Sequence, residues 1–145
     1  MIANQLYFED IHEGQSIPPL VKHPTPRQLV KWAASSEEYY EIHYDKDFAI
    51  EKGLPGIVCH GMLLISFLGQ MITDWIGPRG TLKKLTTSNR ALAIPNQDLT
   101  CKGVVTKKYT ENGENIVQYD IFLEDSKGEK CITGSALATL PNHDT

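Results

Sequence analysis

The sequence predicts an α+β fold in which an antiparallel β-sheet wraps around one long buried helix. Two observations carry this prediction. The stretch HGMLLISFLGQMITDWIG is apolar on nearly every face of a helix and ends at Gly77-Pro78, as expected for a helix inside a protein. The C-terminal part of the chain then reads as successive strands, two of them joined by Asn112-Gly113, the strongest short signal for a β-hairpin.

The first element is an edge strand within residues 6–21. Pro18 and Pro19 lie in it, and proline cannot donate a hydrogen bond to a central strand ladder. A helix follows from Pro26 to about Ser35. Thr25 is a suitable N-cap, proline is favoured at the first helical position, and Gln28 completes a capping box.

A second short helix is predicted from Asp45 to Lys52, with Gly53 as its C-terminal stop. The segment LPGIVCHG must then be extended or irregular, because it holds Pro55 and Gly56. The long apolar helix begins at Gly61. Three strands follow, and the alternation within the middle one gives it one buried and one wet face. These strands are residues 99–109, 115–124 and 130–140.

Length and composition predict one domain spanning residues 1–145. The chain has 41% apolar residues, 22% charged residues and a net charge of −4, a composition typical of globular proteins. The acidic balance argues against a nucleic-acid partner. No secretion signal is recognised and the apolar run from Met62 to Ile72 is too short and interrupted to span a bilayer, so we expect no membrane association and a cytoplasmic location.

The cysteines Cys59, Cys101 and Cys131 are far apart and form no CxxC pair. They are predicted to be small buried residues of a reducing compartment, and none is expected to act as a nucleophile. The sequence also contains no metal-ligand set, glycine-rich phosphate loop or serine elbow. We therefore expect no metal and no cofactor.

One short stretch, SEEYYEIHYDKDFAIEKG, brings together groups suited to acid–base chemistry. Glu38 and His43 are five residues apart, which on an α-helix would place them about 140° apart around the axis. If one helix ends near Ser36 and the next begins near Asp45, the loop between them can turn both side chains to one side. A carboxylate and an imidazole converging on a water can act as general acid and base. The alternative is an ordinary polar turn.

The start of the apolar helix supplies a second feature. Gly61 would offer an unpaired backbone N–H at a helix N-terminus, where it can stabilise negative charge on a carbonyl oxygen. The alternative is that Gly61 only permits a tight turn. His60 is interpreted first as a capping or satisfied core histidine, and second as a residue of a substrate pocket.

Other polar residues carry less weight. Ser66 and Gln70 either line a pocket or serve helix packing, while Asp74 and Trp75 are interpreted as structural. A group of basic residues could bind the phosphates of a coenzyme, although a solvated surface is the simpler interpretation. This group consists of Arg79, Lys83, Lys84 and Arg90.

Together, the strings EEYYEIHYDKDFA, VCHGMLL and IPNQDLTCKGVV resemble the MaoC-like, or (R)-specific, enoyl-CoA hydratases and dehydratases of the hotdog fold. The resemblance runs from about Leu6 to Pro141. The family's motif is an Asp, four residues and a His, followed by a helix that opens with HGM. The resemblance implies syn addition of water to a trans-2-enoyl thioester, or the reverse dehydration, within fatty acid metabolism.

By this resemblance, Glu38 and His43 hold the water: one draws off its proton, and the other helps to deliver a proton to C2. The N–H of Gly61 binds the thioester oxygen. Two positions depart from the family's pattern, because Glu38 replaces its Asp and Tyr40 replaces its Asn. Tyr40 is expected to shape the acyl pocket or to replace the lost hydrogen bond. Glu37 is a weaker substitute for the carboxylate.

Alternative functions remain open on the same fold. A hotdog thioesterase is one, although the helix from Gly61 to Thr73 contains no Asp or Glu of the kind that many of them use. A non-catalytic acyl-CoA-binding subunit of a heteromeric hydratase is another. The expected partners are a thioester of coenzyme A or of an acyl-carrier protein as substrate, and a second copy in a homodimer or a related hotdog subunit in a heterodimer.

Overall fold

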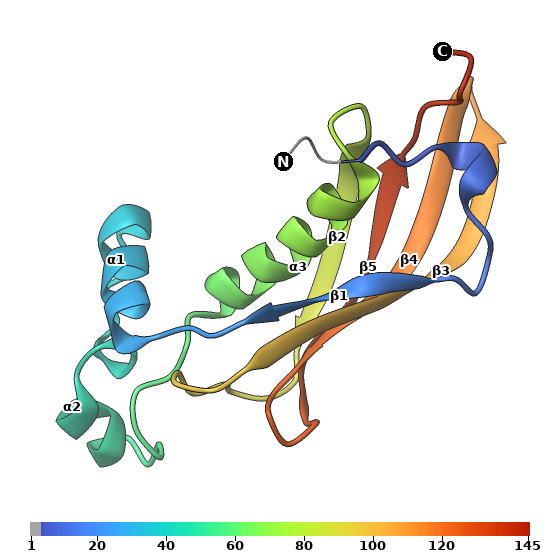
Figure 1. The fold of residues 1–145 in the computed structure, drawn as a ribbon. Coiled ribbons are helices and arrows are strands. Elements are labelled where there is room, and N and C mark those ends of the chain that lie inside the picture. Colours follow the sequence, from blue (N-terminus) through green and yellow to red (C-terminus); the bar gives the residue numbers. More distant parts are fainter. Residues whose placement is uncertain (1–3) are drawn as a thin grey trace.

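Five antiparallel strands form one sheet in the computed structural model, which describes residues 4–145. Their order across the sheet is β1-β3-β4-β5-β2 (Figure 1). The α+β fold, with a sheet around a central helix, is therefore confirmed. The strands are β1 (Ser16–Lys22), β2 (Thr81–Asn89), β3 (Leu99–Glu111), β4 (Glu114–Glu124) and β5 (Lys130–Thr139).

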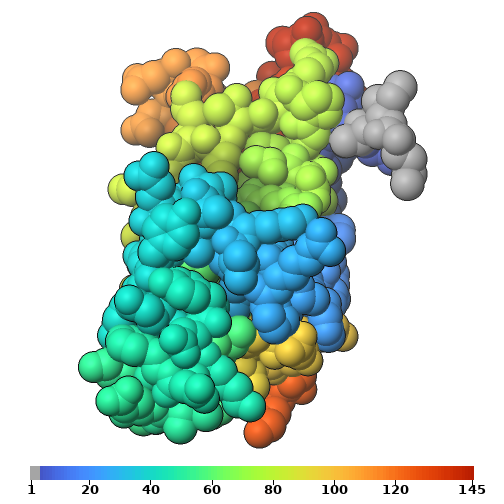
Figure 2. All heavy atoms as spheres, turned by 90° about the vertical axis from the view of Figure 1, so that its left-hand side faces the viewer, coloured from blue at the N-terminus to red at the C-terminus, as the bar shows by residue number. Residues whose placement is uncertain are grey.

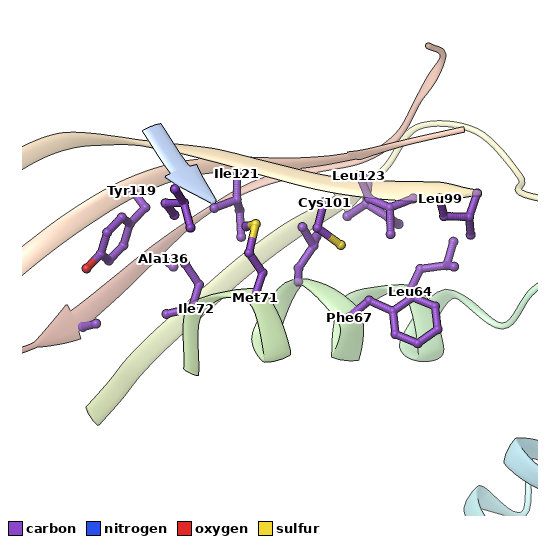
Figure 3. Close-up of a cluster of buried hydrophobic side chains, with 14 of the residues drawn as sticks. Leu64, Phe67, Met71, Ile72, Leu99, Cys101, Tyr119, Ile121, Leu123 and Ala136 are labelled. Atoms are coloured by element: carbon purple, nitrogen blue, oxygen red, sulfur yellow. The ribbon is translucent and has the colours of Figure 1, made fainter. Parts of the chain in front are cut away.

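Helix α3 (Gly61–Ile76) lies along the inner face of this sheet and forms the core with it. Figure 3 shows Leu64 and Met71 of α3 directed toward the side chains of the strands, and Phe67 and Ile72 of the same helix are also buried in the core. Because side chains alternate across a strand, Leu99, Cys101 and Val105 of β3 and every second residue from Val117 to Leu123 of β4 are buried in this core. The strand residues labelled in Figure 3 are Leu99, Cys101, Tyr119, Ile121, Leu123 and Ala136, all buried.

The other side of α3 is open in the single chain. Met62 is 65% exposed, and the exposed positions that follow at helical spacing are Ser66, Gln70 and Thr73. A helix whose sequence is apolar on almost every face therefore buries one face against the sheet and leaves outside a narrower stripe that is polar after Met62.

Helices α1 (Pro26–Ser36) and α2 (Lys46–Glu51) lie beyond the N-terminal end of α3, with the 3-10 turn η2 (Glu41–His43) between them (Figure 1). Helix α1 begins at Pro26 as predicted, and the Thr25 side chain accepts a hydrogen bond from Gln28 N at 3.3 Å. Helix α2 begins at Lys46, one residue after the predicted start, because Asp45 is its N-cap and accepts from Phe48 N at 3.1 Å. Figure 2 shows this end of the molecule, where the region from α1 to α2 fills the front of the face. A further 3-10 turn, η1, spans Phe8–Asp10.

The strand predictions hold for β3, β4 and β5, and the turn between β3 and β4 has the expected geometry. Asn112 and Gly113 have φ values of 51° and 78°, the left-handed conformation that a two-residue hairpin turn needs. Strand β1 is an edge strand as predicted, and its pairing with β3 shifts between Ile17 and Leu20, around the two prolines.

Strand β2 was not predicted. It lies at the opposite edge of the sheet, and its pairing with β5 shifts between Leu82 and Lys84, which breaks the alternation of apolar and polar residues. At one place this edge approaches β5 very closely: a Cβ on Gly134 would run into the backbone carbonyl oxygen of Thr86. Within residues 4–145, no helix is long and apolar enough to cross a membrane.

Candidate active site

His43 is held in one orientation by the backbone around it. It ends the turn η2 and is only 8% exposed. Its Nδ1 lies 2.7 Å from the carbonyl oxygen of Val58, and the N–H of Val58 donates to the carbonyl of Ile42 at 3.1 Å. A carbonyl can only accept, so Nδ1 of His43 carries the hydrogen. In the neutral ring, Nε2 then keeps its lone pair and is free to accept a proton.

Glu38 lies in the loop that follows α1. Glu37 ends that helix in the left-handed conformation, with φ 58°, and the chain then turns toward η2. The Glu38 carboxylate accepts a hydrogen bond from the backbone N–H of Tyr40 at 3.1 Å. Glu38 is exposed as a residue, so its carboxylate is supported by the loop and remains within reach of solvent.

The rings of His43 and His60 are stacked, with centroids 3.8 Å apart and planes inclined by 19°. His60 is 2% exposed, and its Nε2 donates to the carbonyl oxygen of Glu38 at 3.3 Å. Its Nδ1 has no hydrogen-bond partner among the described residues. Burial, and then the nearby His43, lower the pKa of His60, while the Glu38 carbonyl acts in the opposite direction.

The structure therefore changes the interpretation of His60. It stands at the N-cap position of α3, but its side chain makes no capping hydrogen bond. It is also not a fully satisfied core histidine, since one ring nitrogen is unpartnered. Its contacts are instead with the two residues that were predicted to hold a water.

Gly61 is the first residue of α3, so its N–H has no acceptor within the helix. The helix dipole adds partial positive charge at this end. The side chain of Asn89, the last residue of β2, lies beside it: a Cβ built on Gly61 would be 3.5 Å from Asn89 Oδ1. The start of α3 thus lies beside a carboxamide from β2, a strand that the sequence did not predict.

Two hollows meet at His43, Gly61 and Asn89. The first, of about 400 Å³, also contains both Glu38 and His60, and its other lining residues are Trp32, Ser36, Met62 and Ile65. The second, of about 310 Å³, is mostly apolar, and its other lining residues are Cys59, Leu64, Arg90, Ala91, Leu92, Ala93 and Ile132. The structure thus brings Glu38, His43, His60 and Gly61 to one place.

Two further predicted residues lie at the margin of this site or away from it. Tyr40 packs edge-on against His43, with ring centroids 6.4 Å apart, and lines neither hollow. Ser66 lies on the open side of α3, where its hydroxyl donates to the Leu63 carbonyl at 2.6 Å. The structure does not bring Ser66 to the site. Of the basic group, Arg90 alone lines one of the two hollows.

The cysteines are buried, as predicted. Burial raises the pKa of Cys59, which lines the apolar hollow, to about 12, so its thiol stays protonated at neutral pH. Among residues 4–145 no three His, Cys, Asp or Glu side chains come together as metal ligands. A separate hollow, of about 720 Å³, runs across the outer face of the sheet and contains none of the predicted acid–base residues.

The model of the MaoC-like domain family matches residues 12–121, which is well over half of the chain. The chain belongs to the MaoC-like domain family. The match includes α1, the loop with Glu38 and His43, the start of α3 and most of β4.

Solved structures show the same hotdog fold. The (R)-hydratase from A. caviae involved in PHA biosynthesis has a TM-score of 0.83 and 22% identity, over 92% of this chain and 99% of that one. The R-hydratase PhaJ1 from Pseudomonas aeruginosa has a TM-score of 0.87 and 21% identity, over 96% and 88%. The ChsH1–ChsH2 complex from Mycobacterium tuberculosis has a TM-score of 0.77 and 19% identity, over 89% and 98%.

A curated relative is the 3-oxo-4,17-pregnadiene-20-carboxyl-CoA hydratase beta subunit of Mycobacterium tuberculosis. It is 25% identical over 72 residues, which are 50% of this chain and 56% of the relative. The match therefore spans about half of that protein's length. A second relative is the fatty acid synthase beta subunit TOXC of Cochliobolus carbonum, at 27% identity over 105 residues. That match covers only 5% of the relative's length.

Proposed function

We propose that this chain adds water to a trans-2-enoyl thioester to give the (R)-3-hydroxyacyl thioester, or catalyses the reverse dehydration. The observation that carries this proposal is the single hollow lined by Glu38, by His43 and by Gly61 at the start of α3. A base, a carboxylate and an oxyanion donor are the groups that such a reaction needs. Membership of the MaoC-like family and the fold shared with (R)-hydratases support it.

In the proposed hydration, His43 Nε2 takes a proton from the water as the water oxygen bonds to C3. The electron pair of the C2–C3 double bond moves toward the thioester oxygen, which gains enolate character beside the N–H of Gly61. The proton on His43 then passes to C2, and the ring is neutral again. Glu38 accepts the second hydrogen of the water, fixes its position and stabilises the transient imidazolium.

Glu38 is one methylene longer than the family's Asp. With the same backbone, its carboxylate would lie about 1.5 Å further out, a displacement that can cost on the order of 100-fold in rate. The hydrogen bond from Tyr40 N draws this carboxylate back toward its own loop. This bond supports the view that the loop accommodates the longer side chain.

The two hollows suit the two ends of an acyl thioester. The apolar one is suited to the acyl group, and the more polar one to the thioester and the pantetheine arm of coenzyme A or an acyl-carrier protein. We propose a homodimer as the default assembly. The open side of α3 and the unpaired outer edge of β2 are the surfaces that a second copy could cover.

A panel of enoyl-CoA thioesters of varied length and branching tests the proposal directly. Loss of the enoyl absorbance, with formation of the (R)-3-hydroxy product on chiral analysis, is the expected result. Release of free thiol, detected with a thiol reagent, would instead revive the thioesterase alternative. Loss of enoyl absorbance with formation of the (S) product would overturn the stereochemical assignment.

A second candidate is an acyl-CoA-binding subunit that needs a partner for activity. The relation to a hydratase beta subunit and to the ChsH1–ChsH2 complex favours it. The purified chain would then bind acyl-CoA, for example in calorimetry, and hydrate nothing in the panel. Activity of the purified chain at a normal turnover rate would exclude this candidate.

A further inference from the structure

We propose that His60 is a positioning residue, which fixes the orientation of the His43 imidazole and the position of the loop that carries Glu38. This inference rests on the proposed function and extends it. The sequence alone indicates a capping, core or pocket role for His60 and not a role in positioning other residues. It is carried by two contacts of one side chain, the 3.8 Å stack on His43 and the 3.3 Å hydrogen bond to the Glu38 carbonyl.

The first contact restrains a ring that would otherwise have freedom to tilt. The hydrogen bond from Nδ1 to Val58 fixes one edge of the His43 ring but leaves rotation about that bond open. The nearly parallel ring of His60 closes one face of His43, while Tyr40 meets His43 edge-on at 6.4 Å. With these contacts, Nε2 is held in one direction, as proton transfer to a substrate atom requires.

The second contact ties the carboxylate-bearing loop to the start of α3. The Glu38 carbonyl accepts from His60, and two residues later the N–H of Tyr40 donates to the Glu38 carboxylate. His60 is also the residue directly before Gly61. One rigid, buried ring thus links the proposed base, the proposed carboxylate and the oxyanion donor.

The unpartnered Nδ1 of His60 supports a role other than stability. A buried polar atom without a hydrogen bond is unfavourable, and a phenylalanine would fill a similar volume without one. The ring must also remain neutral beside a histidine that is protonated during the reaction. Deep burial of His60 favours this neutral form.

Two substitutions separate the two contacts. His60→Phe keeps a flat ring against His43 and removes the donor to Glu38, whereas His60→Gln keeps an N–H donor and removes the ring. We expect each to lower kcat about 10- to 100-fold and to change KM less than about threefold, as expected for misplaced reacting groups. His12→Gln, at an exposed position, is the matched control and should change neither constant.

A double-mutant cycle identifies the route of the effect. With Glu38→Ala, the position of that carboxylate no longer matters, so His60→Phe should cost less than half of its logarithmic effect on kcat in the wild type. Additive losses, or a rise in KM with kcat unchanged, would overturn the positioning role. Variants that unfold at the assay temperature in a circular dichroism melt are replaced by His60→Asn, to which the same criteria apply.

A spectroscopic measurement separates this inference from the proposed function. In ¹⁵N spectra of the histidine rings, His60 should be neutral with its hydrogen on Nε2 at pH 7 and above, whether or not the protein hydrates any thioester. A hydrogen on Nδ1, or a charged His60 ring at pH 7, would overturn the inference even if hydration is observed. Lack of hydration by the wild type, with the expected spectrum, would overturn only the proposed function.

Discussion

Nδ1 of His43 lies 2.7 Å from the carbonyl oxygen of Val58, a group that can only accept a hydrogen bond. This one contact decides the tautomer of the neutral ring and thereby which nitrogen can act as a base. A histidine that is 8% exposed thereby remains useful for chemistry: Nδ1 carries the hydrogen, Nε2 keeps its lone pair, and the residue lines both hollows.

The first prediction concerns His43 itself. His43→Ala should lower kcat for enoyl-thioester hydration by at least about 100-fold, because it removes the proposed base. Steady-state kinetics with the best substrate of the panel measure this. A folded variant that keeps the full rate would rule out the proposed pair of Glu38 and His43.

The second prediction concerns the length of the Glu38 side chain. Glu38→Gln removes the charge and should lower kcat about 10- to 1,000-fold. Glu38→Asp keeps the charge but shortens the side chain, and this loop holds the longer side chain through Tyr40 N. We therefore expect Glu38→Asp to lower kcat, but by less than Glu38→Gln does. A higher kcat for the Asp variant would mean that the extra methylene is a handicap.

The third prediction isolates the backbone donor at Gly61. Gly61→Pro removes the N–H at the first position of α3, where proline is otherwise well tolerated, and His60 before it already has the extended conformation that a following proline requires. We expect kcat to fall about 10²- to 10³-fold, as for the loss of an oxyanion donor.

Gly61→Ala is the control for that experiment. It keeps the N–H, and its Cβ would meet Asn89 at an ordinary contact distance of 3.5 Å. It should therefore retain most of the activity. Equal losses in the alanine and proline variants would point to crowding beside Asn89 and away from a role for the N–H.

The fourth prediction concerns pH and stability. The folded state holds the pKa of His60 below 6.5, so the unfolded chain binds a proton at this residue more readily than the folded chain. As pH falls below about 6.5, His60 should therefore lower the free energy of unfolding, by up to about 1.4 kcal/mol per pH unit. Above about pH 6.5, the contribution of His60 to the free energy of unfolding does not change with pH.

Urea unfolding of the wild type and of His60→Phe at pH 5.5, 6.0 and 7.5 measures this effect. The stability of the variant relative to the wild type should increase at each step toward acid, since the variant lacks the titrating group. Parallel pH dependence for the two proteins would show that His60 takes up its proton equally well in both states.

The fifth prediction tests the close approach of β2 and β5. Gly134→Ala should destabilise the fold by at least about 2 kcal/mol, because its Cβ would meet the backbone carbonyl of Thr86, which cannot move aside cheaply. Gly69→Ala in α3 is the control. There the Cβ would meet only the end of Leu85 at 3.9 Å, and alanine favours the helix by up to about 1 kcal/mol. Thermal unfolding distinguishes the two, and similar melting temperatures would contradict the prediction.

Much of the fold could be predicted because its signals are local. Thr25 caps α1, Asn112-Gly113 forms the hairpin turn, and the apolar run from Gly61 onward is α3. Each of these depends on residues that are neighbours in sequence. Strand β2 could not be predicted in the same way, because an edge strand with a register shift shows no regular alternation.

The candidate site could also be predicted only where its signals are local. Glu38, His43 and Gly61 were proposed from spacing, from a helix start and from resemblance, and the structure brings them together. The stack of His60 on His43 and the approach of Asn89 to Gly61 were not foreseen. His43 and His60 are 17 residues apart, and Gly61 and Asn89 lie on different elements. Only the folded backbone brings each pair together, so no local sequence pattern predicts these contacts.

His43, Gly61 and Asn89 lie between an apolar hollow and a more polar one. Residues such as Leu92 and Ile132 belong to the apolar side alone, and Glu38 and His60 to the polar side alone. If the chain has the proposed function, acyl-group selection and acid–base chemistry would depend largely on different residues. For the proposed hydratase, substitutions at Leu92 or Ile132 should alter the range of acyl groups accepted while Glu38 and His60 keep their positions.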